Sequence, residues 1–183
     1  MSPTPVTSLH ELQQISALNA LNNKRNISAE ESREQGFVSW FYDLDLLQKM
    51  HAFAPSIICK DGDQLAGYAL TAPSECAAVH RELGLLLQKL SGIEYMGKLL
   101  LQHSYYIMGQ LCVAKEYRGK GVVELMYNEH RRLFSSQYDL MVLTVAVANT
   151  RSIRVHERIG FKTIKRIEDH FGDWVVMVWD WRG

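Results

Sequence analysis

Apolar residues recur every three or four positions in several stretches of the chain, the spacing of helices that bury one face. The clearest stretch has apolar residues at positions 9, 12, 15, 18 and 21 and ends at Asn22-Asn23. Ser28, Asp43 and Ser74 are placed to cap later helices, and Ser28 begins a capping-box pattern. We therefore expect helices over residues 9–21, 28–36, 43–50, 74–90, 121–135 and 149–160.

Other stretches are rich in β-branched and aromatic residues, which favour strands. These are residues 55–60, 65–72, 104–114, 139–147, 161–167 and 174–181. The turn Asp61-Gly62-Asp63 joins the first two strands as a hairpin. We assign no element to residues 1–8 or to the glycine-containing segment 91–101. The order of elements predicts an α/β fold in which helices pack on one central sheet.

Composition narrows the class of protein. The chain has 183 residues, of which 47% are hydrophobic, enough to fill the core of one domain over residues 1–183. Its 20 Lys and Arg balance its 20 Asp and Glu, so no basic field would hold nucleic acid or an anionic membrane. No apolar run approaches the roughly 20 residues of a membrane span, and the first residues do not resemble a signal peptide. We expect a soluble, cytoplasmic protein that binds any anion through a few groups at one site and not through its net charge.

The cysteines and histidines show no metal-binding pattern. Cys59, Cys76 and Cys112 are far apart and lie in or beside apolar segments, so we expect buried free thiols. The histidines lack the spacing of a metal site, and we expect no metal.

The most informative segment joins a strand to a helix through Arg118-Gly119-Lys120-Gly121. Glycines let the main chain approach a ligand closely, and the N-terminus of the following helix offers N–H groups and a positive dipole. An arginine can fork onto phosphate oxygens, so a diphosphate is a suitable ligand. The residues of the nucleoside triphosphate and dinucleotide motifs are absent. The alternative is an ordinary turn that needs glycine for its dihedral angles.

A second segment, residues 149–161, follows an inner strand. Asn149, Ser152 and His156 are spaced by three and four residues, which places them along one side of a helix.

Together these segments resemble the GNAT superfamily of acyl-CoA-dependent N-acyltransferases. The resemblance rests on residues 111–113, 118–123 and 149–161, and the element order fits from about residue 28 to the C-terminus. It implies a central mixed, mostly antiparallel sheet flanked by helices. It also implies acetyl-CoA as co-substrate and direct attack of a primary amine on the thioester in a ternary complex, without a metal or a covalent intermediate.

The resemblance assigns roles to particular residues. The backbone of the strand before the turn would bind the pantetheine arm, and the Val113 N–H would face the oxyanion. The turn would hold the pyrophosphate, and Asn149 would contact the pantetheine or adenosine end, with Ser152 on the same path. The expected coenzyme-binding residues are Leu111, Cys112, Val113, Arg118, Gly119, Lys120, Gly121, Val122, Val123, Asn149 and Ser152.

Two positions depart from the family pattern. Val123 stands where the pattern ends in a small residue, and its branched side chain either displaces the coenzyme or repacks the helix. His156 stands where the family often has a tyrosine that protonates the departing thiolate. An imidazole with an ordinary pKa of about 6.5 is roughly a quarter protonated at neutral pH, so His156 is a candidate general acid. The alternative is a surface histidine packed over the helix.

The general base and the acceptor site are less defined. The strand before the turn carries no carboxylate or imidazole, so His103, Glu94 and a water chain all stay open as the base. By resemblance, the N-terminal helices flank the acceptor pocket, and aromatic side chains there suit an apolar or cationic amine. The same residues suit a core equally well. The candidates are Phe37, Trp40, Tyr42 and Tyr106, with Phe41 and Tyr105 nearby.

The favoured function is therefore an N-acetyltransferase acting on a small-molecule or protein amine. The alternative is a non-catalytic acyl-CoA sensor, which CoA would stabilise without any thiol release from acetyl-CoA. The tryptophan-rich strand over 174–181 is a candidate exposed edge, through which two copies would form a homodimer.

Overall fold

The computed structural model describes residues 1–183 except 29, 31–35, 170–171 and 183. A seven-stranded sheet forms its centre, in the spatial order β1-β2-β3-β6-β7-β9-β8. Its strands are β1 (Ser2–Pro5), β2 (Ile57–Asp61), β3 (Gln64–Ala72), β6 (Tyr105–Val113), β7 (Leu140–Ala146), β8 (Lys162–Asp169) and β9 (Gly172–Asp180). A separate hairpin consists of β4 (Glu94–Tyr95) and β5 (Lys98–Leu99).

Neighbouring strands in the main sheet are antiparallel except for β6 and β7, which run parallel. The predicted mixed, mostly antiparallel α/β sheet is therefore confirmed. The hairpin between β2 and β3 closes from Asp61 to Gln64 through Gly62, whose φ of 60° favours glycine.

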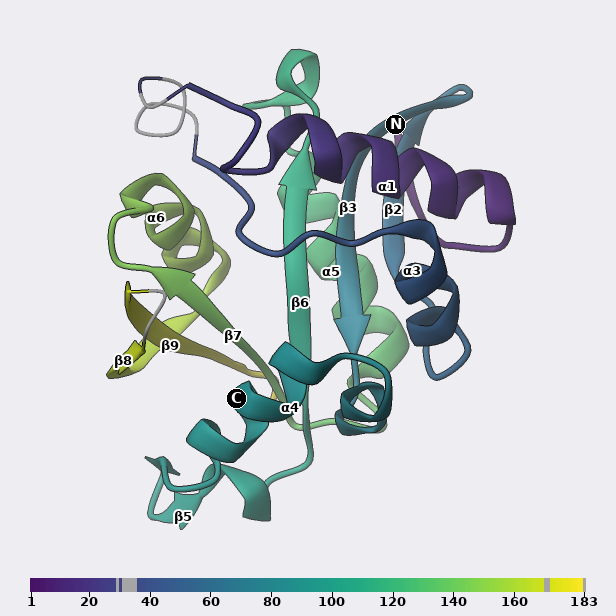
Figure 1. The fold of residues 1–183 in the computed structure, drawn as a ribbon. Helices are drawn as coiled ribbons and strands as arrows, with labels where there is room; N and C mark the ends of the chain where they lie inside the picture. The colour runs from purple at the N-terminus through teal and green to yellow at the C-terminus, as the bar shows by residue number, and fades with distance from the viewer. Residues whose placement is uncertain (29, 31–35, 170–171, 183) are drawn as a thin grey trace.

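Helices cover both faces of this sheet. Seen in Figure 1, α1, α3 and α4 lie in front of the strands and α5 lies behind them. The described α-helices are α1 (Leu9–Asn22), α3 (Leu44–His51), α4 (Arg81–Leu90), α5 (Val122–Phe134) and α6 (Thr150–Ile159). Short 3-10 turns occupy Ser74–Ala78, Leu100–Gln102 and Lys115–Tyr117.

Side-chain caps set the starts of the first helices. Ser8 caps α1 in a capping box with Glu11, whose Oε2 accepts hydrogen bonds from the Ser8 N (3.2 Å) and the Thr7 N (2.8 Å). The Asp43 Oδ1 accepts from the Leu46 N at 2.8 Å, which confirms the predicted cap of α3. The helix predicted over 28–36 falls on residues 29 and 31–35, outside the described part of the chain.

One helix prediction was wrong. The stretch 74–90 is not one helix capped by Ser74, because the backbone is extended at His80 (φ −125°, ψ 96°). The 3-10 turn therefore ends before it, and the His80 Nδ1 caps α4 by accepting from the Leu83 N at 3.4 Å. The Ser74 hydroxyl donates instead to the Glu75 carboxylate.

The pattern also missed two strand pairs, β1 with β2 and β4 with β5. β1 contains Pro3 and Pro5, which normally argue against a strand, but β1 is an edge strand. On an edge strand the proline nitrogens, which carry no hydrogen, can point to the side that has no neighbouring strand.

The tryptophan-rich strand β9 is not a sheet edge, which corrects the basis for the predicted homodimer. β9 pairs with β7 on one side and β8 on the other. Trp179 and Trp181 are buried in the domain core. The edges of the sheet are β1 and β8.

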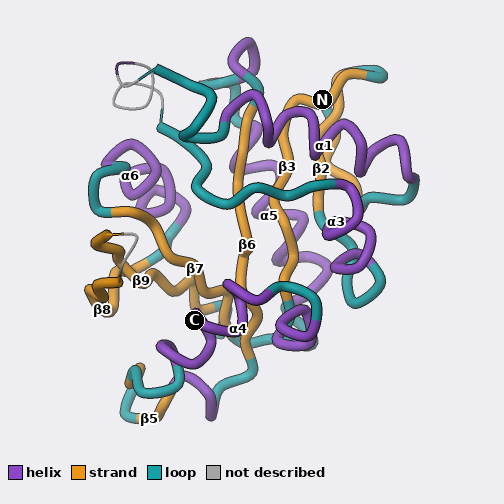
Figure 2. Tube along the Cα trace, in the orientation of Figure 1, coloured by secondary structure: helices purple, strands orange, loops and turns teal. Residues whose placement is uncertain are grey.

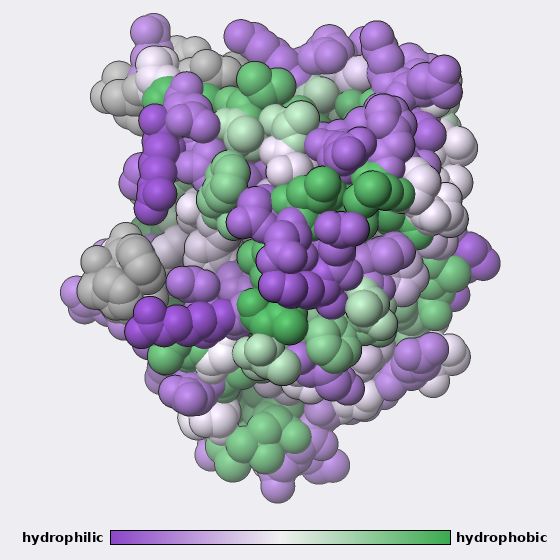
Figure 3. All heavy atoms as spheres, turned by 45° about the vertical axis from the view of Figure 1, so that its right-hand side comes forward, coloured by the Kyte–Doolittle hydropathy of each residue, from purple (hydrophilic) through white to green (hydrophobic). Residues whose placement is uncertain are grey.

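All three cysteines are free and buried, as predicted. On the face shown in Figure 3, apolar residues form separate groups between polar ones. Among the described residues, no helix is long and apolar enough to cross a bilayer.

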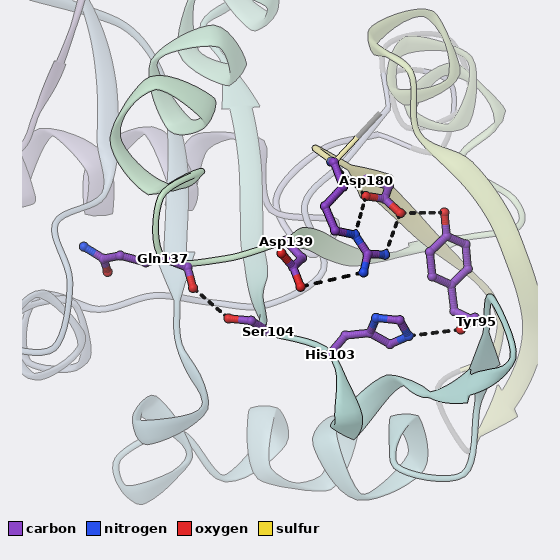
Figure 4. Close-up of polar contacts among 7 residues, drawn as sticks. Tyr95, His103, Ser104, Gln137, Asp139 and Asp180 are labelled. Atoms are coloured by element: carbon purple, nitrogen blue, oxygen red, sulfur yellow. Dashed lines mark hydrogen bonds and ion pairs between the residues drawn. The ribbon is translucent and has the colours of Figure 1, made fainter.

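A polar network fixes the β4–β5 hairpin to the end of the main sheet (Figure 4). The Tyr95 hydroxyl donates to the Asp180 Oδ2 at 3.4 Å, and the His103 Nε2 lies 3.0 Å from the Tyr95 carbonyl oxygen. Arg182 pairs with the same Asp180 carboxylate, at 2.8 Å from Nη2 to Oδ2. The segment that follows α4 is thereby anchored, and His103 is engaged in this anchor.

Candidate functional site

The parallel strands β6 and β7 separate in the middle of the sheet. Their pairing covers only residues 105–107 of β6 and 140–142 of β7, although β6 continues to Val113 and β7 to Ala146. Figure 1 shows the two strands spreading apart from their lower ends. More than half of each strand, residues 108–113 of β6 and 143–146 of β7, therefore lacks a partner on this side and faces an opening.

β6 carries a bulge beside this opening. Its partners on β3 shift between Leu111, opposite Ala69, and Met108, opposite Thr71, so β6 carries one extra residue there. Such a bulge bends a strand and increases its twist. Gly109 lies in it, and a Cβ at that position would meet the Tyr42 hydroxyl at 3.3 Å.

The opening exposes backbone groups on one side of β6. The Ala114 N donates to the Ala66 O on β3 at 2.9 Å, and the Cys112 carbonyl oxygen also lies against β3. Because successive peptide groups of a strand alternate in direction, those of Leu111 and Val113 point away from β3, into the opening. Of the three residues predicted to bind pantetheine through the backbone, Cys112 thus faces the wrong way.

Two cavities meet at this opening. The turn cavity, about 880 Å³, lies between the glycine turn and α6, and is lined by Arg118, Gly119, Gly121, Val123 and Arg154 among others. The inner cavity, about 500 Å³, lies on the other side, between α4 and strands β6, β7 and β9. Both are lined by Phe37, Val38, Leu111, Asn149 and Ser152.

The glycine turn leaves space for a ligand at the start of α5. Gly119 and Gly121 both have a φ of 76°, and a Cβ on either would meet no atom within 4 Å. Gly121 is the N-cap of α5 and offers no side chain to cap the helix. The first N–H groups of α5 are thus available to an anion, as the sequence predicted.

Arg118 lies at the turn cavity but binds protein atoms that the sequence did not indicate. Its Nε donates to the Val113 carbonyl oxygen at 3.1 Å, and its Nη2 donates to the Asn22 Oδ1 at 2.6 Å. The guanidinium therefore braces the turn against β6 and the end of α1. Lys120 lies over the ring of Tyr117, with 5.5 Å from Nζ to the ring centroid.

The turn cavity is electropositive although the chain has no net charge. Four arginines line it, Arg118 from the turn and three from α6, with Glu124 as the only carboxylate among its described lining residues. The α6 arginines are Arg151, Arg154 and Arg158. Their spacing of three and four residues keeps them on one side of the helix.

Val122 and Val123 both line the turn cavity at the start of α5. Val122 is buried, and Val123 is half-buried against the hydrophobic core. The branched side chain of Val123 therefore packs partly inward while its backbone N–H stays in the first turn of α5.

Asn149 links α6 to the segment before α3. Its Oδ1 accepts from the Ser152 N at 3.2 Å, which caps α6, and its Nδ2 donates to the Phe37 carbonyl oxygen at 3.2 Å. Both amide ends are therefore bonded to protein. Asn149 and Ser152 lie where the two cavities meet, so their predicted place on the ligand path agrees with the geometry.

His156 is buried, with 1% of its surface exposed, and is not the surface residue or the partly protonated acid considered from the sequence. Its Nδ1 donates to the Ser152 carbonyl oxygen (2.7 Å), and its Nε2 accepts from the Tyr127 hydroxyl (2.6 Å). Burial lowers the pKa of the imidazole to about 4. A neutral ring with both nitrogens occupied has no proton to give at neutral pH.

The aromatic candidates for the acceptor site divide into two groups. Phe37 and Trp40 line the inner cavity, whereas Tyr42 and Tyr106 are fully buried core residues that line neither cavity. The Asn19 Nδ2 donates to the Trp40 carbonyl oxygen at 3.1 Å, which holds this segment against α1. Figure 2 shows the same loop crossing in front of β6 on its way to α3.

Neither candidate base predicted from the sequence, His103 or Glu94, lines a cavity. The structure instead brings Glu82 and Lys89 of α4, and Trp174 of β9, to the inner cavity. The sequence offered one signal for the first two, since residues seven apart lie on the same face of a helix.

A nucleophilic cysteine has no support in the site. Burial raises the pKa of the Cys112 thiol to about 12. Among the described residues, no group of three His, Cys, Asp or Glu could hold a metal ion.

The model of the acetyltransferase (GNAT) family matches residues 18–161. Among solved structures, the chain is similar to Ard1 from Thermoplasma volcanium, at 12% identity and a TM-score of 0.65, with 98% of both chains covered. It is similar to a ribosomal-protein-alanine N-acetyltransferase from Brucella melitensis, at 16% identity and a TM-score of 0.63, covering 98% of this chain and 99% of that one. It is also similar to the NatC complex bound to Gag peptide and CoA, at 16% identity and a TM-score of 0.64, with the same coverage. No curated protein sequence matches.

Proposed function

The chain belongs to the acetyltransferase (GNAT) family, and from this premise we propose that it moves the acetyl group directly to a primary amine while both substrates are bound. It is an N-acetyltransferase, and acetyl-CoA is its co-substrate. The acceptor and the mechanism are the proposed parts.

The observation that carries the proposal is the opening between β6 and β7, with a cavity on each side. Coenzyme A would occupy the turn cavity, and the acceptor amine the inner cavity. The residues shared by the two cavities, such as Leu111 and Asn149, mark where a thioester and an amine would meet.

The residues of the turn cavity fit coenzyme A. The glycine turn provides space and N–H groups for the pyrophosphate, and the arginines of α6 provide charge for phosphate groups. The backbone N–H and carbonyl of Leu111 point into the opening, where the pantetheine amides would find partners. When bound, acetyl-CoA supplies a thioester carbonyl for the amine to attack.

The protein's own contribution is positioning and oxyanion binding. We assign the Val113 N–H to the oxyanion, since it faces the opening, while the Val113 carbonyl is bonded to Arg118. His156 acts by position, because it holds Ser152 and Tyr127 and has no proton to donate. A thiolate whose conjugate thiol has a pKa of about 8.5 can leave without an acid.

Substitutions in the glycine turn test the proposal. Gly119→Ala and Gly121→Ala force a residue with a Cβ to adopt a φ of 76° and direct a methyl group into open space at the turn. We expect calorimetric affinity for CoA to fall at least tenfold, about 1.4 kcal/mol, because the methyl group occupies the anion's place. Thiol release from acetyl-CoA should fall in parallel.

Gly92→Ala is the matched control, since its Cβ would also meet nothing within 4 Å but its φ is not positive. If the turn variants bind CoA as the wild type does, the coenzyme does not lie at the turn. If the wild type binds CoA but releases no thiol with any amine, the acetyl transfer is refuted.

Three expectations from the sequence remain proposals. We expect one domain over residues 1–183, a cytoplasmic location and a homodimer, and light scattering at micromolar concentration tests the last. The similar structures show the fold alone. The choice between a small-molecule and a protein amine therefore depends on the residues that line the inner cavity.

A further inference from the structure

Helix α4 presents charged residues at the two ends of one cavity-lining face. Glu82 lies in its first turn and Lys89 in its last, and both line the inner cavity. Seven residues place them about 10 Å apart along the helix axis. Leu85 and Leu86 line the cavity between them.

Glu82 is the only carboxylate among the described residues that line the inner cavity. Its side chain is 48% exposed, and its Oε2 lies 3.4 Å from the His80 Nδ1. The His80 ring lies 4.8 Å from the ring of Trp40, centroid to centroid, and Trp40 lines the same cavity. Glu82 and Trp40 thus both contact the His80 ring and both line this end of the cavity. A carboxylate together with an aromatic ring is a combination that attracts an organic cation.

Lys89 gives the other end the opposite character. Its Nζ donates to the Glu168 carbonyl oxygen on β8 at 3.4 Å, which holds a positive charge near the strands. Met108 and Trp174 add apolar surface to the lining of the cavity. A carboxylate therefore lines one end of the cavity and an ammonium group lines the other.

Building on the proposed function, we propose that the inner cavity selects a small apolar monoamine. A primary alkyl amine is protonated near neutral pH, because its pKa is close to that of lysine, about 10.4. The amine binds as an ammonium beside Glu82 and Trp40, and its apolar part packs on Leu85 and Leu86. It loses one proton to water before the neutral nitrogen attacks the thioester, and the proton released when the amide forms goes to the departing thiolate. Lys89 disfavours diamines and polyamines. A volume of about 500 Å³, enclosed by several elements, suits a small molecule.

The test compares hexylamine with 1,5-diaminopentane in a thiol-release assay. We expect wild-type kcat/KM to favour hexylamine. Glu82→Gln should raise KM for hexylamine about tenfold, as expected when a partner of a bound charge is lost, with CoA affinity unchanged. Lys89→Gln should raise kcat/KM for the diamine severalfold and thus narrow the preference.

Asp45→Asn and Lys98→Gln are matched controls, because both residues are exposed and line neither cavity. Neither control should change KM for hexylamine or the preference for hexylamine over 1,5-diaminopentane. Melting temperatures check that every variant is folded, and a purely structural role of α4 would not alter the choice between two amines.

The outcomes separate the two levels of the proposal. If no amine is acetylated by the wild type, the proposed function fails. If amines are acetylated but Glu82→Gln and Lys89→Gln keep wild-type KM and selectivity, only the inference about α4 fails. Faster turnover of short peptides with free N-termini than of any monoamine would overturn it in favour of a protein acceptor.

Discussion

Lowering the pH from 7.0 to 5.5 should destabilise this protein through two buried histidines. His130 and His156 are both fully buried, and burial lowers the pKa of each to about 4 from an ordinary value of 6.5. His130 is held as His156 is: its Nε2 donates to the Ala69 carbonyl oxygen at 3.2 Å, and its Nδ1 accepts from the Tyr106 hydroxyl at 2.9 Å. Both rings are thus neutral in the folded protein.

The unfolded chain binds more protons than the folded one between the two pKa values, so stability must fall as pH decreases through this window. At pH 5.5 an unfolded histidine is about 90% protonated and each buried ring only about 3%. Integrating from pH 7.0 gives a loss of about 1.2 kcal/mol per histidine, or about 2.5 kcal/mol for both. His80, whose pKa burial also lowers, acts in the same direction. Most carboxylates stay ionised at pH 5.5, because their ordinary pKa values lie near 4.

Urea unfolding at a series of pH values, followed by tryptophan fluorescence, measures this loss directly. We expect a slope near pH 5.5 of about 1.2 kcal/mol per pH unit for each histidine. His130→Gln should lower the slope by the share of one histidine, whereas His10→Gln, at an exposed position, should leave it unchanged. A free energy of unfolding that stays constant from pH 7.0 to 5.5 would refute the assignment of neutral buried rings.

Two further substitutions test how the site is built. Gly67→Ala should destabilise the fold by about 1–3 kcal/mol in urea unfolding, because the new Cβ would lie 2.8 Å from the Cys112 carbonyl oxygen. Gly92→Ala, in open space, should change stability little, and equal effects of the two would contradict this. Asn149→Ala should cost about 1 kcal/mol through loss of the α6 cap and should also weaken CoA binding, because Phe37 loses its bond to the Asn149 amide. An unchanged urea midpoint and unchanged CoA affinity would show that Asn149 stabilises neither α6 nor the CoA site.

Local sequence signals predicted the elements that depend on short-range physics. The apolar spacing over 9–21 and the capping aspartate Asp43 predicted α1 and α3, and the apolar, β-branched run 139–147 predicted the inner strand observed as β7. The glycine turn was located because glycine conformation and helix polarity are properties of the chain itself. The structure confirms the turn itself, with a φ of 76° at Gly119 and Gly121 directly before α5.

What the sequence did not reveal depends on packing between distant segments. Trp40 and Tyr42 look alike in the sequence, yet one lines a cavity and the other is buried, because only the path of the loop over β6 decides which faces inward. The sequence predicts an ordinary pKa for His156, because its partner Tyr127 is 29 residues away in the chain. The place of Glu82 in the site depends on the packing of α4 beside β6, β7 and β9, which are segments far from it in the sequence.

The sparse pairing of β6 with β7 makes this sheet two half-sheets joined at one end. Three residue pairs connect them, whereas seven pairs connect β7 with β9 within one half. A coenzyme bonded to β6 on one side and to α6 on the other would bridge the two half-sheets. It would replace the hydrogen bonds that are missing between β6 and β7. Its binding would then cross-link the two halves, and amide exchange in β7, β8 and β9 should slow together when CoA is added.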